Sequence, residues 1–370
     1  MYNNFKFYRI SIYIFLITYN YIMKKIIFTG GGTGGHIMPN LAIINDIKDK
    51  YEIKYIGSKN GMEKEIVSKM LPYYEITTCK LKRSLSPSNL LIPFKLIKGI
   101  CEAKKILKNE QPDLVFSKGG YVSVPVVIAA KSLKIPIISH ESDYTIGLAN
   151  KFTSKFSKVV CTSFEDTAKS LRNGVYTGSP IRKEIFKGNR QNLKNKLCLK
   201  PNLPTLLVVG GSLGSQSINK IISNTAEYIT KKFNIVHIAG KNNKIESNIK
   251  NYNIIAYANN IEDYYDISDI VVTRGGSNVL FELLALKKPM LIVPLEKGSR
   301  GDQVLNANIF EREKLGVKLL ENEIENDSKL LIKKLEDLFN KKQYYIKNME
   351  QKNYYGNKKI IEQIEKYLKK

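Results

Sequence analysis

Short apolar runs alternate along the chain with longer segments that mix polar and apolar residues. Apolar runs rich in β-branched residues are typical of buried strands, and the segments between them have the length of helices. One series of runs lies at 26–29, 53–56, 114–116, 135–138 and 159–161, and a second at 206–209, 235–239, 254–257, 270–273 and 290–293. Alternating strands and helices are typical of βαβ units, so the pattern predicts two parallel α/β sheets.

A segment with little strand character separates the two series. Thr177-Gly178-Ser179-Pro180 interrupts regular structure, and the stretch up to Pro204 is rich in Lys and Asn. We therefore expect a Rossmann-like N-terminal domain over 23–182 and a Rossmann-like C-terminal domain over 183–345. In the tail at 346–370, a helical spacing of apolar residues predicts an amphipathic helix that packs back on the first domain. These apolar residues are Ile360, Ile361, Ile364, Tyr367 and Leu368.

The first 22 residues differ in character from the rest of the chain. Their apolar run at 12–17 is too short to span a bilayer. Met23 is followed directly by the first predicted strand, with no small-residue cleavage site before it. We expect residues 1–22 to be a non-essential extension, and a signal peptide or interfacial anchor is the alternative.

Both series begin with a strand that runs into glycines, at Gly30–His36 and Gly210–Gly214. Such turns let backbone N–H groups approach a phosphate, and the following helix adds a positive dipole. The sequence thus predicts two facing phosphate sites. The first turn also matches G-x-G-x-x-G, but an NAD site needs an acid after the second strand, where Ile56-Gly57-Ser58 stands. We therefore disfavour an NAD enzyme.

Composition narrows the partners only slightly. The 370 residues, 43% of them hydrophobic, suffice for two domains. A net charge of +25 predicts attraction to something anionic, but the lysines spread along the whole chain and no nucleic-acid motif is present, so we expect no nucleic-acid partner. The four cysteines lack the spacing of a metal site, so we expect no metal and reduced thiols of a cytosolic protein.

Five motifs, taken in their order, resemble one family. They are Gly31–His36, His140–Asp143, Gly178–Arg182, Gly210–Ser212 and Arg274–Glu282. This set resembles the MurG family of N-acetylglucosaminyltransferases from about Met23 to the tail. The resemblance implies an α/β, glycosyltransferase B-type fold with two Rossmann-like domains facing a cleft.

The resemblance also implies an activity. Members invert the anomeric centre and transfer GlcNAc, without cofactor or metal, from UDP-GlcNAc to the C4 hydroxyl of MurNAc-pentapeptide on diphospho-undecaprenol. The product, lipid II, serves peptidoglycan synthesis. The implied location is the cytoplasmic face of the bacterial plasma membrane, with peripheral attachment.

An inverting transfer needs a base for the acceptor hydroxyl and groups that stabilise the departing UDP. His36, where the first glycine turn becomes a helix, is the first candidate base, and a helix-capping role is its alternative. His140 and Glu141 follow a predicted strand, where α/β proteins place ligand groups. They are further catalytic candidates, unless they form a local pair that orients a loop.

The resemblance implies a set of substrate-binding residues. These are Thr33, Gly34, Gly35, Tyr121, Asp143, Arg182, Ser212, Ile261, Ser277, Asn278, Glu282 and Gln303. Arg182 and the turn with Ser212 would stabilise the diphosphate, and the Glu282 carboxylate would hold the ribose hydroxyls. Gln303 would lie near the donor sugar. Asp143 stands where the family often has Asn, and Asp302 replaces a second glutamine of some members.

A membrane patch is predicted at Leu90, Leu91, Ile92 and Phe94. Cationic residues surround it: Lys80, Lys82, Arg83 and Lys95. Apolar residues ringed by cations suit an anionic leaflet, so an anionic membrane surface is an expected partner. The alternative is an internal loop with core residues.

Two other functions are compatible with parts of the sequence. A UDP-GlcNAc epimerase uses a similar two-domain fold and the same donor, but the apolar patch argues against it. A non-enzymatic basic protein that binds membranes or nucleic acid is the other, and the two glycine turns with His36 and Glu282 argue against that.

Overall fold

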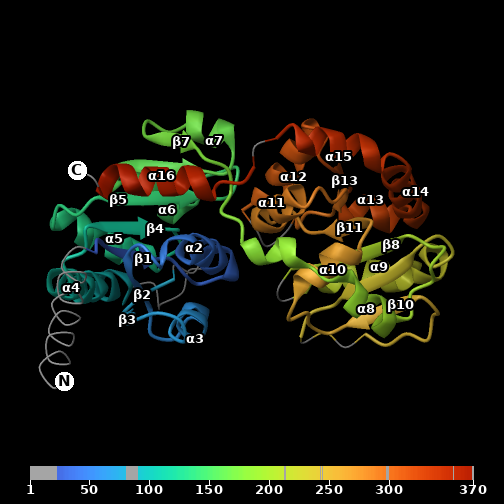
Figure 1. Cartoon of the computed structure of the whole chain (residues 1–370), viewed down its shortest axis with the longest axis horizontal. Helices are drawn as coiled ribbons and strands as arrows, with labels where there is room; N and C mark the ends of the chain where they lie inside the picture. The colour runs from blue at the N-terminus through green and yellow to red at the C-terminus, as the bar shows by residue number, and fades with distance from the viewer. Residues whose placement is uncertain are drawn as a thin grey trace, which may run out of the picture. The chain divides into compact units, whose positions relative to one another are not determined.

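The structure is a computed structural model that describes residues 23–80, 91–211, 214–241, 243, 245–296, 300–352 and 354–368 (Figure 1). The predictions for residues 1–22, Leu90, Lys82, Arg83 and Ser212 lie outside these ranges.

The first sheet has seven strands in the order β3-β2-β1-β4-β5-β6-β7. Its strands are β1 (Lys25–Thr29), β2 (Glu52–Ser58), β3 (Tyr73–Ile76), β4 (Leu114–Ser117), β5 (Ile137–Glu141), β6 (Val159–Thr162) and β7 (Gly174–Tyr176). In the parallel register, Ile26 of β1 lies between Ile53 of β2 and Leu114 of β4. The connecting elements are α2 (Gly34–Ile47), α3 (Met62–Val67), α4 (Ile92–Glu110), α5 (Ser123–Ser132), α6 (Leu148–Thr153), η2 (Ser154–Phe156) and α7 (Glu165–Lys169).

The second sheet has six strands in the order β10-β9-β8-β11-β12-β13. They are β8 (Thr205–Val209), β9 (Asn234–Ile238), β10 (Tyr252–Ile255), β11 (Ile270–Thr273), β12 (Met290–Ile292) and β13 (Val317–Lys318). The helical elements after β7 are η3 (Lys183–Lys187), α8 (Arg190–Leu197), α9 (Gln216–Ile229), α10 (Ile261–Ile267), α11 (Ser277–Ala285), α12 (Asp302–Arg312), α13 (Glu321–Asn326), α14 (Ser328–Asn340), α15 (Lys342–Glu350) and α16 (Asn357–Leu368).

Burial explains why the strands read as continuous apolar runs. All residues of β4, β8, β9 and β11 are buried, as expected for parallel strands that are covered on both faces. On α9, Ile218, Ile222, Ala226 and Ile229 recur at helical spacing and pack into a core with the strands of the second sheet.

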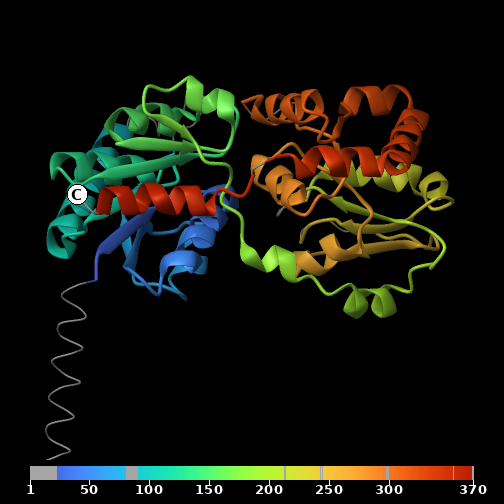
Figure 2. The same ribbon diagram turned by 45° about the horizontal axis from the view of Figure 1, so that its top comes forward.

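The chain divides into two compact units. The first unit contains the described residues up to 140, together with 147–160 and those from 359 onward; the second contains 141–146 and 161–358. Helix α16 therefore returns to the first unit (Figure 2). There Ile360, Ile364 and Leu368 are buried, and Glu365 pairs with Lys50. The division passes through β6, so the predicted domain boundary at residue 182 stays a prediction.

All ten strands predicted from apolar runs are present, with bounds shifted by at most a few residues. Three further strands, β3, β7 and β13, have no matching run among those ten, because their side chains are mostly half-buried. No helix in the described ranges is long and apolar enough to cross a bilayer.

Candidate active site

In each sheet the strand order reverses between two central neighbours, β1 and β4 in the first and β8 and β11 in the second. Ligands of open α/β sheets bind outside the carboxyl ends of the strands at such reversals. A glycine-containing turn follows each of these four strands. The turns contain Gly30–Gly35, Gly119–Gly120, Gly210–Gly211 and Gly275–Gly276. The topology therefore places the predicted glycine motifs at the ligand-binding edge of each sheet.

A buried glutamate fixes the first glycine turn. The Glu63 carboxylate on α3 is fully buried and accepts hydrogen bonds from the N–H of Gly32 at 3.0 Å and from the N–H of Ser58 at 3.2 Å. The Ser58 hydroxyl donates to the same carboxylate. A Cβ on Gly31 would lie 2.4 Å from the carboxyl carbon of Glu63, so a side chain there would displace the carboxylate.

His36 lies in the first turn of α2, and Thr33 is the N-cap residue. Nδ1 of His36 is 2.9 Å from Oγ1 of Thr33. When Nδ1 carries the proton and donates to Thr33, Nε2 is the nitrogen that can take a proton from a substrate. The contact agrees with the predicted position of His36 at the start of a helix. It also agrees with the proposed role of His36 as the base that takes the proton of the acceptor hydroxyl.

The turn after β4 packs against the first glycine turn. Gly120 has φ +78°, and a Cβ there would lie 2.6 Å from the Gly31 carbonyl oxygen and 3.3 Å from Nδ1 of His36. The ring of Tyr121 closes over Gly32 in the same way. Burial, together with the charge of Glu63, raises the pKa of Tyr121, so its hydroxyl stays protonated.

Two glycines have no steric reason to be glycine. Gly34, the first residue of α2, and Gly276, the N-cap of α11, both have ordinary φ values, and a Cβ on either would meet no atom within 4 Å. A glycine that neither strain nor crowding requires leaves room for close approach to the backbone. Both positions lie at helix N-termini, which attract anions.

His140 and Glu141 end strand β5, and both are buried. The Glu141 carboxylate accepts hydrogen bonds from the N–H groups of Ser142 at 2.9 Å and Asp143 at 3.1 Å. These contacts match the alternative in which Glu141 orients the loop. His140, with no exposed surface, is less suited than His36 to meet a substrate hydroxyl.

Asp143 belongs to a hydrogen-bonded cluster in the second unit. Nδ2 of Asn306 on α12 donates to Oδ1 of Asp143 at 3.1 Å and to the Gly275 carbonyl at 3.0 Å. Oδ1 of Asn306 accepts from the Tyr144 N–H at 2.9 Å. One buried asparagine thus ties the 141–146 segment to the glycine turn after β11.

The structure brings Arg182 and Glu282 together. Nη2 and Nε of Arg182 lie 3.1 and 3.3 Å from Oε1 of Glu282, and the Tyr265 hydroxyl lies 3.4 Å from Oε2. Burial raises the pKa of the Glu282 carboxyl, and the Arg182 guanidinium opposes part of that rise. The two residues predicted to contact diphosphate and ribose are thus partners of each other here.

The remaining predicted donor-side residues lie on three helices of the second unit. Ile261 is the first residue of α10 and is half-buried. Ser277 and Asn278 open α11. Oε1 of Gln303 on α12 accepts from the Leu295 N–H at 3.0 Å, so its amide oxygen holds the segment after β12. Among the described residues, no three His, Cys, Asp or Glu side chains gather closely enough to hold a metal ion.

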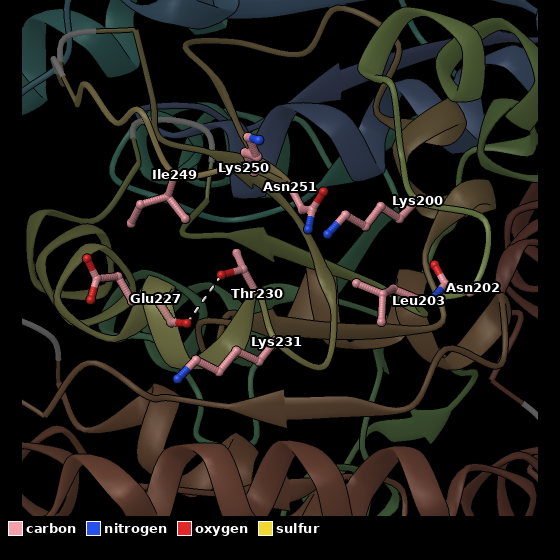
Figure 3. A pocket seen from close by; sticks show the side chains of 9 residues that line it. All are labelled: Lys200, Asn202, Leu203, Glu227, Thr230, Lys231, Ile249, Lys250 and Asn251. Atoms are coloured by element: carbon pink, nitrogen blue, oxygen red, sulfur yellow. Dashed lines mark hydrogen bonds between the residues drawn. The ribbon is translucent and has the colours of Figure 1, made fainter.

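A pocket of about 590 Å³ lies elsewhere in the second unit (Figure 3). It is lined by Lys200, Asn202, Leu203, Glu227, Thr230, Lys231, Ile249, Lys250 and Asn251. These residues precede β8, β9 and β10, so the pocket lies at the amino ends of the strands. It is therefore at the opposite edge of the sheet from the glycine turns.

Comparison with known proteins gives the family. Residues 26–162 match the glycosyltransferase family 28 N-terminal domain, and 205–364 match the glycosyltransferase family 28 C-terminal domain. A UDP-N-acetylglucosamine–N-acetylmuramyl-(pentapeptide) pyrophosphoryl-undecaprenol N-acetylglucosamine transferase of Clostridium botulinum is 49% identical over 357 residues, which cover 94% of this chain and 100% of the relative. The transferase of the same name from Clostridium tetani is 47% identical over 354 residues, 93% of this chain and 98% of its own.

The chain belongs to the MurG family. Acinetobacter baumannii MurG has a TM-score of 0.73 at 21% identity, over 93% of this chain and 99% of that one. A Neisseria meningitidis UDP-GlcNAc 2-epimerase, solved with UDP-GlcNAc bound, has a TM-score of 0.64 at 16% identity, over 93% and 100%. At these identities the likeness to the two structures is evidence for the fold alone. The predicted α/β class with two Rossmann-like domains of glycosyltransferase B type is confirmed.

Three residues that contact the glycine turns or their neighbouring residues carry no functional signal in the sequence. Glu63 lies in Met62–Val67, a short charged helix that reads as a solvated segment. Asn306 lies on α12 without a motif of its own. Arg274 opens a motif that assigns it no role, and in the structure it is a buried cation beside the second glycine turn.

Proposed function

We propose that this glycosyltransferase moves GlcNAc from UDP-GlcNAc to the C4 hydroxyl of MurNAc-pentapeptide on diphospho-undecaprenol and forms lipid II. The observation that carries the proposal is full-length identity of 49% to a transferase of that name. The placement of glycine turns at the strand reversals of both sheets supports it.

The proposed step is a single displacement. The acceptor oxygen forms a bond to the anomeric carbon of GlcNAc while the bond from that carbon to the diphosphate oxygen breaks, which inverts the centre. Nε2 of His36 accepts the proton of the acceptor hydroxyl, and Thr33 holds the ring through Nδ1. The second glycine turn and Arg182 stabilise the charge of the departing UDP.

Donor binding exchanges partners at the Arg182–Glu282 pair. The carboxylate holds Arg182 through Oε1. A diphosphate offers the guanidinium a second, more strongly charged partner, and the ribose hydroxyls offer the carboxylate two donors. The pair then opens, and each residue takes the substrate group that the sequence assigns to it.

The direct test is purified protein with UDP-GlcNAc and lipid I, scored for UDP release and for lipid II by mass spectrometry. The proposal expects both products in equal amounts, with UDP release dependent on the acceptor. Conversion of UDP-GlcNAc to its 2-epimer without acceptor would favour the epimerase. No product with any lipid acceptor would favour a non-enzymatic basic protein.

The first turns of α4 support peripheral attachment to an anionic membrane. Leu91, Phe94 and Ile97 expose 53%, 72% and 59% of their surface. These values disagree with the alternative that the segment is an internal loop with core residues. The three apolar residues recur at every third position, so they share one face of the helix, and the exposed cations Lys95 and Lys98 lie beside them. Ile92, a member of the predicted patch, is half-buried.

Replacing Leu91, Phe94 and Ile97 by serine tests this attachment. Each apolar side chain that enters a lipid surface contributes about 1.5–3 kcal/mol, so binding to phosphatidylglycerol vesicles falls at least tenfold. Met62 and Met70, exposed elsewhere in the first unit, provide a matched control when changed to serine. Equal vesicle binding by the two variants would rule out α4 as the membrane face.

A further inference from the structure

Arg274 is a buried cation directly after β11 and contacts three other segments of the second unit. Only 8% of its surface is exposed. Nη1 donates to the Val293 carbonyl, after β12, at 3.0 Å and lies 2.7 Å from Oε1 of Glu321, the first residue of α13. Nη2 donates to the hydroxyls of Ser215 and Ser217, each at 2.5 Å. The guanidinium therefore joins the turn after β8 to β12 and α13.

The two serines connect Arg274 to the second glycine turn. Ser215 is the N-cap of α9, and its hydroxyl accepts from the Ile218 N–H at 3.4 Å. It also packs against Gly210, since a Cβ on that glycine would lie 2.7 Å from the Cβ of Ser215. The next residue, Gly211, has φ +101° and faces open space. Fixing Ser215 thus fixes Gly210 and the N-terminus of α9, beside the open space at Gly211.

The contacts of Arg274 assign it a positioning role. A guanidinium has five N–H donors, and the four partners already occupy both terminal nitrogens. Glu321 offsets its charge and also accepts from the Ser217 hydroxyl at 2.5 Å. A guanidinium engaged in this way has little capacity left for a phosphate, but it holds three chain segments in one geometry.

We propose that Arg274 and Glu321 are a positioning pair that holds Gly210, Gly211 and the N-terminus of α9 in the geometry that binds the donor diphosphate. The inference rests on the proposed function, because it concerns the UDP part of the same donor. Neither residue touches the nucleotide. Their effect passes through Ser215 and Ser217 to Gly210, Gly211 and the N-terminus of α9.

The test compares the affinities for UDP and for uridine, measured by calorimetry and by NMR titration. Uridine lacks the diphosphate, so a defect confined to the turn weakens UDP and spares uridine. Arg274→Lys keeps the charge but cannot hold both serines and Val293. We expect UDP affinity to fall about 10- to 100-fold and uridine affinity to change less than about twofold.

Changes at Glu321 and Ser217 show whether Arg274 acts by positioning these chain segments or as a positive charge that attracts the diphosphate. Glu321→Gln keeps an acceptor and should weaken UDP binding less than about threefold, whereas Glu321→Ala should weaken it about tenfold. Tighter UDP binding by Glu321→Ala would overturn the proposal, because Arg274 would then act as a charge that Glu321 restrains. Ser217→Ala, a milder change, should weaken UDP about threefold and gives the test a second route if Arg274→Lys does not fold.

Lys288→Met is the matched control. Lys288 is another largely buried cation of the second unit, and it donates to the Asp266 and Ser268 carbonyls. Its loss should lower the melting temperature and leave the ratio of UDP to uridine affinity unchanged. Equal weakening of UDP and uridine by Arg274→Lys, or no weakening, contradicts the pair. Failure of the unaltered protein to bind UDP would instead overturn the proposed function, and the inference with it.

Discussion

The two glycine turns are held by groups of opposite charge. Under the first turn, the Glu63 carboxylate accepts from neutral donors, the Gly32 N–H and the N–H and hydroxyl of Ser58. Beside the second, the Arg274 guanidinium donates to Ser215 and Ser217 and pairs with Glu321. Similar glycine motifs therefore have different electrostatic surroundings.

This difference indicates how the two turns divide the reaction. A carboxylate beneath a turn weakens anion binding and consumes one of its N–H groups, which suits the turn that carries His36, where a proton is collected. The second turn is held by a guanidinium through the hydroxyls of Ser215 and Ser217, which suits the departing diphosphate. The glycine motifs alone would predict two equivalent phosphate sites. We propose instead that the two turns are not equivalent.

His36→Ala should have the largest effect on turnover. Loss of a general base lowers kcat by about two to four orders of magnitude, and donor KM should change much less. Steady-state rates with lipid I measure both. Thr33→Val, which removes the contact to Nδ1, should lower kcat by a smaller factor. A near-normal kcat in His36→Ala would move the base to a positioned water or to Glu141.

Glu63→Ala should have the largest effect on folding of the first turn. It leaves the half-buried Gly32 donor and the buried Ser58 donors unpaired, which costs about 2–4 kcal/mol in the free energy of unfolding. Urea unfolding measures the loss. Glu63→Gln keeps one of the two acceptor oxygens and should therefore lose less stability than Glu63→Ala. If Glu63→Ala unfolds at the same urea concentration as the unaltered chain, the carboxylate does not hold the turn.

The second unit should lose stability on mild acidification. Burial lowers the pKa of His237 to about 4 from its ordinary 6.5, and its ring contacts Tyr252 and Asn219. The unfolded chain binds the proton first, so stability is complete above pH 6.5 and falls as the pH drops toward 4. Between pH 7.5 and 4.5 the loss is about 2–3 kcal/mol. Urea unfolding of His237→Gln should lack this slope, and an equal slope would assign it elsewhere.

In the first unit, the carboxyl of Glu110 also has a lowered pKa, and it titrates at lower pH than His237 does. Partial burial raises the pKa of Glu110, but hydrogen bonds from Lys54 and Tyr74 outweigh that effect and bring it to about 2. A lowered carboxyl pKa stabilises the fold above about pH 4.5 and ceases to do so as the pH falls toward 2. Hydrogen exchange at pH 5 should therefore show greater loss of protection in β9 than in β2.

Glu282→Ala should have a smaller effect, confined to the donor. A carboxylate that holds two hydroxyls contributes about 1.5–3 kcal/mol, so the KM for UDP-GlcNAc should rise roughly 10- to 150-fold. Discrimination between UDP and 2′-deoxy-UDP should fall as well. Normal UDP affinity with retained discrimination would place the ribose on another helix.

Local patterns predicted the strands, the glycine turns and the exposed face of α4, because each depends on neighbouring residues. Runs such as Thr205–Val209 are buried on both faces and appear as apolar blocks. The β13 strand, with two half-buried residues, gives no such signal. The apolar patch was predicted to include Ile92, but the helix turns Ile97 to the exposed face in its place.

Contacts between distant residues could not be predicted in the same way. Arg182 and Glu282 are 100 residues apart, and the sequence assigned them separate roles without showing that they pair. Asn306 contacts Asp143 across 163 positions. Glu63 resembles its exposed neighbours on a charged helix, and only the fold places its carboxylate under Gly32. Such pairings depend on strand order, which periodicity does not contain.

Calorimetric titration of UDP into His36→Ala and Arg274→Lys tests most directly whether the two turns divide the reaction. We predict that His36→Ala binds UDP within about threefold of the unaltered protein although its kcat falls by about two to four orders of magnitude, whereas Arg274→Lys binds UDP about 10- to 100-fold more weakly. If His36→Ala weakens UDP binding as much as Arg274→Lys does, both turns hold the diphosphate and the division is wrong.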